Sequence, residues 1–451
     1  MVNSTVAFIG LLWYGIIWSI CLLGCCAARK RYRLRPRSPL ASAPSSQAPG
    51  VSVLRPLKGL DANLYENLES SFTQEYSNFE LLLCVDGDHD QALPVVEELL
   101  RKYPHVNARV VISNEDVGVN PKVNNLIQAY REAAHDILWV LDSNITVDPG
   151  TLARSVDALN KPVSPGKKRI GLVHHVPFAF SNQSTLGARL EEAFLNTNHA
   201  KMYIAINTVA VDSCVMGKSN LYRRSELELV NGHLKRRRDP HEDNERGFGL
   251  AAFGRFLAED NMIAAALWHE LDLRHDLSCD VAQNAIGSMS FSDYIWRRVR
   301  WIRVRKIMSL AATLVEPFTE CIIVSLIAVT CLRALFGRVA FLILPIHYVL
   351  WIWVDLDVYE SLAGYPLLPS KRLAFLSAWI MREFLALPIW ILAMLGNTVS
   401  WRGKRYRIFR SGEVGNAENG KPLSQWFRFG RRATMEREEA RQELLSAQPL
   451  T

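Results

Sequence analysis

The hydrophobic positions of the chain gather first in one long, uninterrupted segment near its start. Val6 to Ala28 contains 23 residues and no charge, which is enough for a helix that crosses a hydrocarbon core of about 30 Å. A cleaved signal peptide carries its positive charge before the apolar segment. Here the basic residues come after it, at Arg29, Lys30, Arg31, Arg33, Arg35 and Arg37. We therefore predict an uncleaved anchor over residues 1–28 and, by the positive-inside rule, a cytosolic domain behind it.

From residue 51 to residue 141 the pattern changes to short apolar runs that alternate with amphipathic ones. A basic and Pro/Ser-rich linker, residues 29–50, precedes this region. Strands that alternate with helices of this length are typical of an α/β domain with a parallel sheet, whose ligands bind beyond the carboxyl ends of the strands. The expected strands are 51–54, 80–85, 108–112 and 136–141, and the expected helices are 64–72, 92–102 and 122–134.

The alternation weakens after Asp142. The last expected helix, 291–310, combines several basic residues with Trp296 and Trp301, which is typical of a helix in the lipid headgroup layer. We end the soluble domain, 51–306, within this helix. The other elements expected after Asp142 are a strand at 170–174, a mixed region up to residue 222, a solvated charged loop at 235–246 and a helix at 257–267.

Three further apolar segments, 308–335, 339–354 and 373–397, make residues 307–400 a region of membrane or re-entrant helices. Each is flawed as a span, because the second is short and the others contain Glu316, Glu320, Arg382 and Glu383. Ionisable groups at such depth are costly unless they face protein or a polar cavity, so we expect them to do so. The basic tail, 401–451, is expected in the cytosol, which requires an even number of crossings after the soluble domain.

Charge and cysteine content narrow the class of protein. The net charge is +7 and the pI about 9.0. The basic residues gather beside apolar segments, which favours a lipid bilayer as the partner and argues against nucleic acid. Five of the eight cysteines fall in apolar segments, and no CxxC pair occurs. We expect reduced thiols, as in a cytosol-facing domain.

Acidic residues directly after a strand form the first candidate site. Asp86, Asp88 and Asp90 follow the expected strand 80–85. Carboxylates at this place can accept hydrogen bonds from the uracil or ribose of a nucleotide. Asp is also common in polar turns and as a helix N-cap. Both interpretations stay open at this point.

A second group follows the very apolar strand 137–141. Asp142 and Asn144 present two oxygens two residues apart, a pair that can hold a divalent cation, Mg²⁺ or Mn²⁺, and through it a diphosphate. Lys122 opens the preceding helix. It is either a phosphate contact at a helix N-terminus or an exposed lysine without that role.

Two further motifs lie in the second half of the domain. Glu259 and Asp260 open an apolar helix, where they are either an ordinary first turn or a general base whose pKa is raised by burial. Arg297, Arg300 and Trp301 in RRVRW offer guanidinium groups to diphosphate oxygens and a flat aromatic wall. The alternative is that these arginines extend to lipid headgroups.

In their order and spacing, these motifs resemble the D, D, D, (Q/R)xxRW signature of GT-A glycosyltransferases. More closely, the chain is similar to the ceramide glucosyltransferases over residues 49–410. That similarity rests on PGVSVLRPLKGLDANLYENLES (49–70), NPKVNNL, DSN, GLVHHVPF (171–178), NTNHAKMY (196–203), SCVMGKS (213–219), LAEDNM (257–262), RRVRWIRVRK and SWRGKRYR (400–407).

The resemblance implies a GT-A (Rossmann-like) fold and a role for each motif. It makes Asp90 the first aspartate of the signature, Asp142 the second and Asp260 the catalytic base. Arg297, Arg300 and Trp301 become its RxxRW motif, and His199 and Cys214 match positions near the donor site. Two departures are visible: the acids of VDGDHD are shifted, so Asp86 or Asp88 can take the place of Asp90, and the charged loop 235–246 looks like an insertion before the base.

The activity implied by the resemblance is the transfer of glucose from UDP-glucose to the primary hydroxyl of ceramide, with inversion. The resemblance also implies a multi-pass protein of the Golgi or endoplasmic reticulum membrane. A polyprenyl-phosphate or polysaccharide glycosyltransferase that uses a UDP-sugar would share the catalytic motifs, although a processive synthase needs a channel of several good spans. A catalytically inactive membrane adaptor is disfavoured, because all three acidic clusters occur in one chain.

Overall fold

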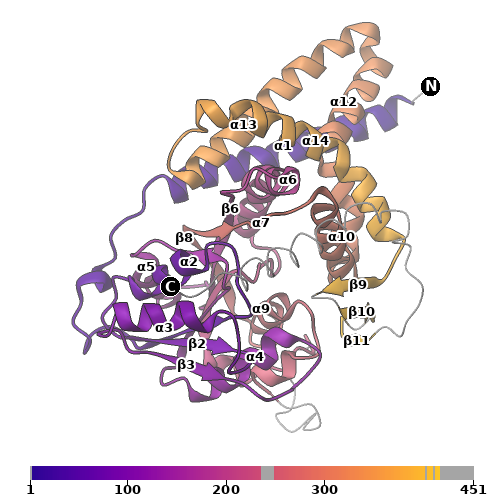
Figure 1. The fold of residues 1–451 in the computed structure, drawn as a ribbon. Helices are drawn as coiled ribbons and strands as arrows, with labels where there is room; N and C mark the ends of the chain where they lie inside the picture. The colour runs from indigo at the N-terminus through magenta and orange to yellow at the C-terminus, as the bar shows by residue number, and fades with distance from the viewer. Residues whose placement is uncertain (1–2, 235–247, 402–403, 410–411, 417–451) are drawn as a thin grey trace.

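The computed structural model of the chain describes residues 3–234, 248–401, 404–409 and 412–416. An eight-stranded mixed sheet lies at one end of this described part, and the apolar helices α1, α12, α13 and α14 gather at the other (Figure 1). The strands are β1 Val51–Pro56, β2 Phe79–Val85, β3 Ala108–Ile112, β4 Ile137–Leu141, β5 Ile145–Thr146, β6 Ile170–Phe180, β7 Ser219–Arg223, β8 Arg274–Ala285, β9 Thr398–Trp401, β10 Lys404–Ile408 and β11 Val414–Asn416. The helices are α1 Ser4–Tyr32, α2 Leu64–Phe72, α3 Leu93–Lys102, α4 Pro121–Glu132, α5 Thr151–Leu159, α6 Leu186–Phe194, α7 Ala200–Val209, α8 Arg224–Leu227, α9 Glu259–His269, α10 Phe291–Met308, α11 Leu310–Val315, α12 Cys321–Phe336, α13 Ile343–Ala363 and α14 Pro369–Met394.

The first half of the sheet is the parallel α/β unit that the sequence predicts. Strands β3, β2, β1 and β4 lie side by side in this order, and all their pairings are parallel. Helix α4 begins where local chemistry favours it, because the Asn120 side chain accepts the Lys122 N–H and Pro121 takes the first helical position. The predicted α/β class is therefore confirmed, and Asp142 lies at the carboxyl end of a central strand.

The second half of the sheet is where the sequence prediction was incomplete. The order continues from β4 through the antiparallel strand β7 to β6, β8 and β5. The strand expected at 170–174 extends to Phe180, and neither β7 nor β8 was expected. In β8 the fully buried Asp280 forms an ion pair with Arg154 at 2.7 Å. Paired charges of this kind interrupt the apolar pattern by which a buried strand is recognised.

The N-terminal apolar helix is longer than the predicted anchor. It ends at Tyr32, so the basic run begins inside the helix rather than in a linker. Four members of this run pair with carboxylates of the protein, which the sequence did not predict. These pairs are Arg29 and Arg33 with Asp357, Arg31 with Asp276, and Arg35 with Asp148.

Three helices of the described residues are long and apolar enough to cross a membrane, at 4–32, 339–363 and 369–394. The pair Leu310–Thr319 and Cys321–Phe336 would also suffice, but it is bent by 68°. The segment expected to be short, 339–354, belongs to a helical stretch of 25 residues. It continues through Asp355, whose charge is compensated by Lys201 of α7 at 2.7 Å.

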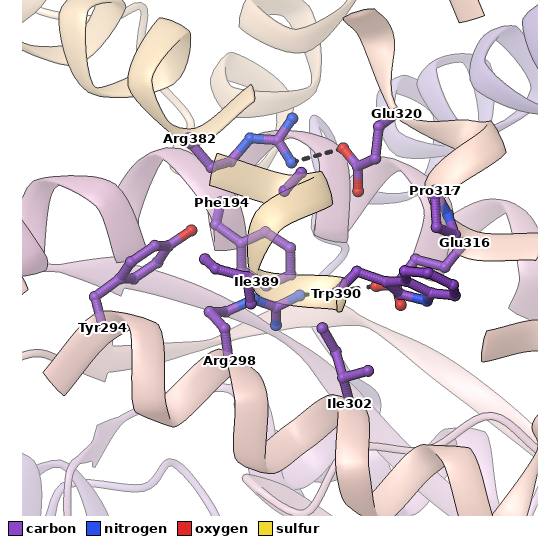
Figure 2. Close-up of a pocket in the computed structure, with 11 residues that line it drawn as sticks. Phe194, Tyr294, Arg298, Ile302, Glu316, Pro317, Glu320, Arg382, Ile389 and Trp390 are labelled. Carbon is purple, nitrogen blue, oxygen red and sulfur yellow. Dashed lines mark hydrogen bonds and ion pairs between the residues drawn. The ribbon is translucent and has the colours of Figure 1, made fainter. Parts of the chain in front are cut away.

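The charged residues within the apolar region face protein, as the sequence predicts. Arg382 pairs with Glu320 at 3.0 Å and also contacts Glu383. Figure 2 shows this pair beside a small pocket between α6, α10 and α14, into which Tyr294 and Arg298 also point. None of the side chains that line this pocket is one of the predicted site residues.

Helix α10 carries the RRVRW motif and packs on protein over much of its length. The capping box of Ser290 and Asp293 starts the helix. Near its end, Arg303 donates to the carbonyls of Leu392 and Ala393, while Lys306 donates to those of Met394 and Gly396. These two basic residues therefore cap the carboxyl end of α14, and a position of this helix in the headgroup layer stays a prediction. The charged loop 235–246 and most of the tail 401–451 lie outside the described residues.

Candidate active site

The centre of the candidate site is Asp142, the first residue after β4. Antiparallel pairing sets Leu141 opposite Ser219, so the next residue pair places Asp142 beside Lys218. The backbone N–H of Asp142 donates to the Lys218 carbonyl at 3.1 Å, and Lys218 Nζ lies 3.1 Å from Asp142 Oδ2. The sheet register itself thus brings this carboxylate and this ammonium group together.

A second lysine binds the other oxygen of Asp142. Lys122 Nζ, from the first turn of α4, lies 2.7 Å from Asp142 Oδ1 and 3.0 Å from Glu259 Oε1. Burial alone would raise the pKa of Asp142, but Lys122 and Lys218 outweigh it and lower that pKa to about 2. The interpretation of Lys122 as an exposed lysine is therefore wrong: it joins the carboxylate that follows β4 to the carboxylates that begin α9.

Asp260 is held at the start of α9, next to the buried Glu259. Glu259 accepts hydrogen bonds from Asn120 Nδ2 at 2.8 Å and from Lys122, whereas the carboxylate of Asp260 faces Gly217. Burial, assisted by the negative charge of Glu259, raises the pKa of Asp260 to about 6. A carboxylate with this pKa is still ionised at pH 7 and is a stronger base than an exposed aspartate. The geometry supports the predicted general base.

The side chain of Asn144 is oriented by hydrogen bonds from its Nδ2 to β8. Its Nδ2 donates to Asn284 Oδ1 at 2.9 Å and to the Ala285 carbonyl at 3.4 Å. Its Oδ1 is consequently turned toward Lys218, whose Nζ donates to it at 3.2 Å. The two oxygens that the sequence assigns to a divalent cation, from Asp142 and Asn144, are thus bridged by one ammonium group.

The motif RRVRW presents two arginines with different surroundings. Arg297 Nε donates to Glu191 Oε1 at 2.7 Å, and its guanidinium lies 4.8 Å from the ring centre of Trp301. Within the part of the chain that the structure describes, Arg300 has no hydrogen-bond or ion-pair partner. Burial and the nearby charge of Arg297 lower the pKa of Arg300 to about 10. Arg300 remains charged at neutral pH and is available to an anionic ligand.

His199 is linked through Tyr203 to the segment that precedes β7. Its ring stacks on Tyr203 with centres 5.5 Å apart, and the Tyr203 hydroxyl accepts the N–H of Met216 at 2.9 Å. Burial, with smaller effects of Arg298 and Arg305, lowers the pKa of His199 to about 3. A neutral His199 thus supports the segment before β7. Its predicted role in donor binding stays a prediction.

The acidic turn after β2 is occupied by local interactions. Asp90 Oδ1 accepts the N–H groups of Gly59 and Ala92, both at 2.9 Å. Asp86 pairs with Lys58, and Asp88 is largely exposed. These contacts are those of a polar turn that precedes a helix. Contact of Asp90 or Asp88 with a nucleotide stays a prediction.

Three residues of the site were missed by sequence reasoning. Lys218, Glu191 and Gly217 lie in segments where no strand or motif was assigned to chemistry. Lys218 and Gly217 lie inside SCVMGKS, one of the similar segments, so that similarity was the available signal. Glu191 is fully buried, but its partner Arg297 is 106 residues away in the chain.

Comparison with known proteins identifies the family of this chain. The sequence model described as glycosyl transferase family 21 matches residues 16–414. The chain belongs to this family. It is a glycosyltransferase, and two aspartates of the signature that its sequence resembles, Asp142 and Asp260, lie close to the same lysine, Lys122.

Several relatives in the family share most of the chain. A protein of Komagataella phaffii named ceramide glucosyltransferase is 37% identical over 461 aligned residues, covering 89% of this chain and 90% of its own. A protein of the same name from Candida albicans is 34% identical, covering 80% of this chain and 86% of its own. Ceramide glucosyltransferase 1 of Caenorhabditis elegans is 31% identical, covering 85% and 76%.

Solved structures are more distant than these family members. A mannosyltransferase of Pyrobaculum calidifontis, solved with GDP-Man and Mn²⁺, is 17% identical and has a TM-score of 0.44, covering 80% of this chain and 98% of its own. A structure of S. aureus TarS with UDP-GlcNAc is 16% identical and has a TM-score of 0.34, covering 82% and 99%. At this similarity, neither ligand is transferred to the present chain.

Proposed function

We propose that this chain transfers glucose from UDP-glucose to the primary hydroxyl of ceramide, with inversion, and forms glucosylceramide. The observation that carries the proposal is the cluster in which Lys122 joins the Asp142 carboxylate to the Glu259–Asp260 pair. This cluster puts a buried base beside a group of cations at the carboxyl end of a sheet, where α/β domains bind their ligands. The names of the relatives that share most of the chain suggest the acceptor and the sugar.

The reaction is a direct displacement. Asp260 takes the proton of the ceramide hydroxyl as the oxygen attacks the anomeric carbon of glucose. The bond from that carbon to the diphosphate oxygen breaks, and UDP leaves with the electron pair. Inversion follows because the incoming oxygen and the leaving diphosphate are on opposite faces of the sugar.

Stabilisation of the leaving diphosphate is assigned to the cations that face it. Lys218, Arg297 and Arg300 lie in partly buried positions, where fixed charges stabilise a developing negative charge more strongly than they do in water. Trp301 provides an aromatic wall beside Arg297. We assign Asp90 or Asp88 to the uridine, as the sequence resemblance implies.

The divalent cation expected from the sequence would have Asp142 and Asn144 as its ligands. Neither oxygen of Asp142 is free, because Lys122 and Lys218 each bind one, and Asn144 Oδ1 also accepts from Lys218. These residues do not fit a Mg²⁺ or Mn²⁺ ion, and no step is assigned to one.

The apolar helices suit a lipid acceptor. We propose that α1, α13 and α14 cross the membrane of the Golgi or endoplasmic reticulum and that the bent pair around Glu320 is re-entrant. Two crossings after the sheet domain would leave both the domain and the segment 401–410 in the cytosol. Protease treatment of sealed microsomes checks this topology, and protection of residues 51–300 would contradict it.

The activity itself is tested with purified protein, labelled UDP-sugars and a panel of lipids. Mass spectrometry should detect glucosylceramide when ceramide and UDP-glucose are both present. Transfer only to a polyprenyl phosphate, or extension of a polysaccharide, would favour the alternative glycosyltransferases of similar signature. The variant Asp260→Asn provides the control for non-enzymatic or contaminating activity.

A further inference from the structure

Lys218 lies where a cation between Asp142 and Asn144 would bind. Its Nζ is 3.1 Å from Asp142 Oδ2 and 3.2 Å from Asn144 Oδ1. A divalent ion would need the same oxygens, and its charge would repel the ammonium group at short range. One of the two cations therefore excludes the other.

The backbone keeps Lys218 at this place. The antiparallel register of β4 and β7 sets it beside Asp142, and the hydrogen bond from the Asp142 N–H to the Lys218 carbonyl fixes the two residues. The side chain is only 16% exposed, so it has little freedom to move into solvent. An ammonium group on a surface side chain would lack this constraint.

The acceptors around Lys218 suit an ammonium group better than a metal ion. Asn144 contributes a neutral amide oxygen, which is turned forward by the hydrogen bonds of its Nδ2. This oxygen accepts from the Lys218 ammonium group, and a carboxylate in its place would be a stronger ligand for a hard divalent cation. The second oxygen of Asp142 is already bound to Lys122 at 2.7 Å.

A second positive group lies near Lys218. Burial lowers the pKa of Lys218, and the positive charge of Arg297 adds to this effect. Within the described residues, Glu191 holds Arg297 through Nε, and the terminal nitrogens of the guanidinium are left for a ligand. Two cations of this kind can be bridged and neutralised by a diphosphate.

We propose that Lys218 is the resident cation of the donor site and that, with Arg297, it binds the diphosphate of UDP-glucose without a divalent metal ion. This proposal rests on the donor proposed above. It replaces the predicted Mg²⁺ or Mn²⁺ by a side chain of the protein. It also gives Asp142 a defined task, which is to hold two lysines rather than a metal.

The test measures binding of UDP to the full-length protein in detergent, by isothermal titration calorimetry, with EDTA or with MnCl₂. Wild-type protein should bind UDP with EDTA within about threefold of its affinity with MnCl₂. Lys218→Met should weaken binding with EDTA by at least about tenfold, since a hydrogen bond to a charged group contributes this much. Lys218→Arg, which keeps the charge, should lose less. Lys161→Met, at an exposed position, is the matched control.

Two outcomes would overturn the proposal. The first is a wild-type protein that loses UDP binding with EDTA and regains it with MnCl₂. The second is Lys218→Met with unchanged affinity in EDTA. If Lys218→Met does not fold, the wild-type protein and Lys218→Arg decide the question alone. Failure to glucosylate ceramide with UDP binding intact would contradict the acceptor only, whereas absence of UDP binding under both conditions would contradict the donor and Lys218 together.

Discussion

The Cα of Gly217 lies directly against the carboxylate of Asp260. A Cβ added to Gly217 would come closer to Asp260 Oδ2 than real Cβ atoms come to their neighbours. The Gly217 carbonyl also accepts a hydrogen bond from Lys122 Nζ at 3.3 Å. A glycine at position 217 therefore leaves space for the Asp260 carboxylate. It also lets the loop before β7 pack closely on the start of α9.

Gly217→Ala is expected to lower glucose transfer by about 10² or more, because a positioned general base contributes roughly 10²–10⁴ in rate and the methyl group would displace it. UDP binding should change much less. Initial rates at saturating UDP-glucose check this. Gly15→Ala is the matched control, since its Cβ would meet nothing within 4 Å. Full activity of Gly217→Ala would argue against Asp260 as the base.

The raised pKa of Asp260 predicts how activity depends on pH. A general base acts only when it is deprotonated, so kcat/KM should fall as the pH drops through about 6 and level off at higher pH. Asp260→Asn should abolish transfer and leave UDP affinity largely intact, because the amide keeps the shape but accepts no proton. Rates and UDP titrations on both proteins provide the test. An equal loss of affinity and turnover would assign Asp260 a structural role.

Glu259 supplies part of the shift at Asp260 and can be changed separately. Glu259→Gln removes a negative charge next to the base, so the acidic limb of the kcat/KM profile should move to lower pH. The amide keeps the volume and can still accept from Lys122. The pH profile of this variant is compared with that of Glu132→Gln, an exposed position. A limb that stays in place would show that burial alone sets the pKa of Asp260.

These residues also show which parts of the site were accessible from sequence. Asp142 was predicted because β4 is a continuous apolar run with an acid at its end, the pattern of a central parallel strand. Lys218 was not, because its place depends on the antiparallel register of β4 and β7. Short polar strands such as Ser219–Arg223 carry too little periodicity to reveal such a register.

The buried charges were also predicted only in part from the sequence. The sequence predicts that Glu320 and Arg382 face protein, since an unpaired charge in hydrocarbon is costly. It does not predict which side chain pairs with which. The partners of the basic run at the end of α1 were not predicted for this reason: the acids that bind it, Asp357 among them, come from segments up to 328 residues away in the chain.

Glu191 is expected to act by positioning Arg297. Glu191→Gln removes the charge that holds the guanidinium at 2.7 Å, so the KM for UDP-glucose should rise about tenfold while the acidic limb set by Asp260 stays in place. Steady-state kinetics against pH separate these effects. Glu192→Gln, at the next position, is the control. If kcat falls with KM unchanged, Glu191 serves a step other than donor binding.

A buried ion pair joins the sheet domain to the apolar helices. Lys201 of α7 and Asp355 of α13 are 2.7 Å apart, and their side chains are 0% and 2% exposed. Trp379 of α14 donates its indole N–H to the same carboxylate at 2.8 Å. The backbone of Lys201 also lies against Gly24, so α1 packs closely on α7. Three apolar helices therefore meet the catalytic domain around one lysine.

Lys201→Met is expected to lower the free energy of unfolding by about 3–5 kcal/mol, because it leaves Asp355 buried without its counter-ion. Lys201→Met with Asp355→Leu should recover much of this loss, since the uncompensated charge is then removed. Thermal unfolding in detergent, followed by tryptophan fluorescence, compares the two. Lys168→Met breaks an exposed pair with Asp272 and should change stability by no more than about 0.5 kcal/mol. A single variant as stable as the wild type would mean that apolar contacts alone hold α7 on α13, and that the charges are not needed to keep the catalytic domain on its membrane helices.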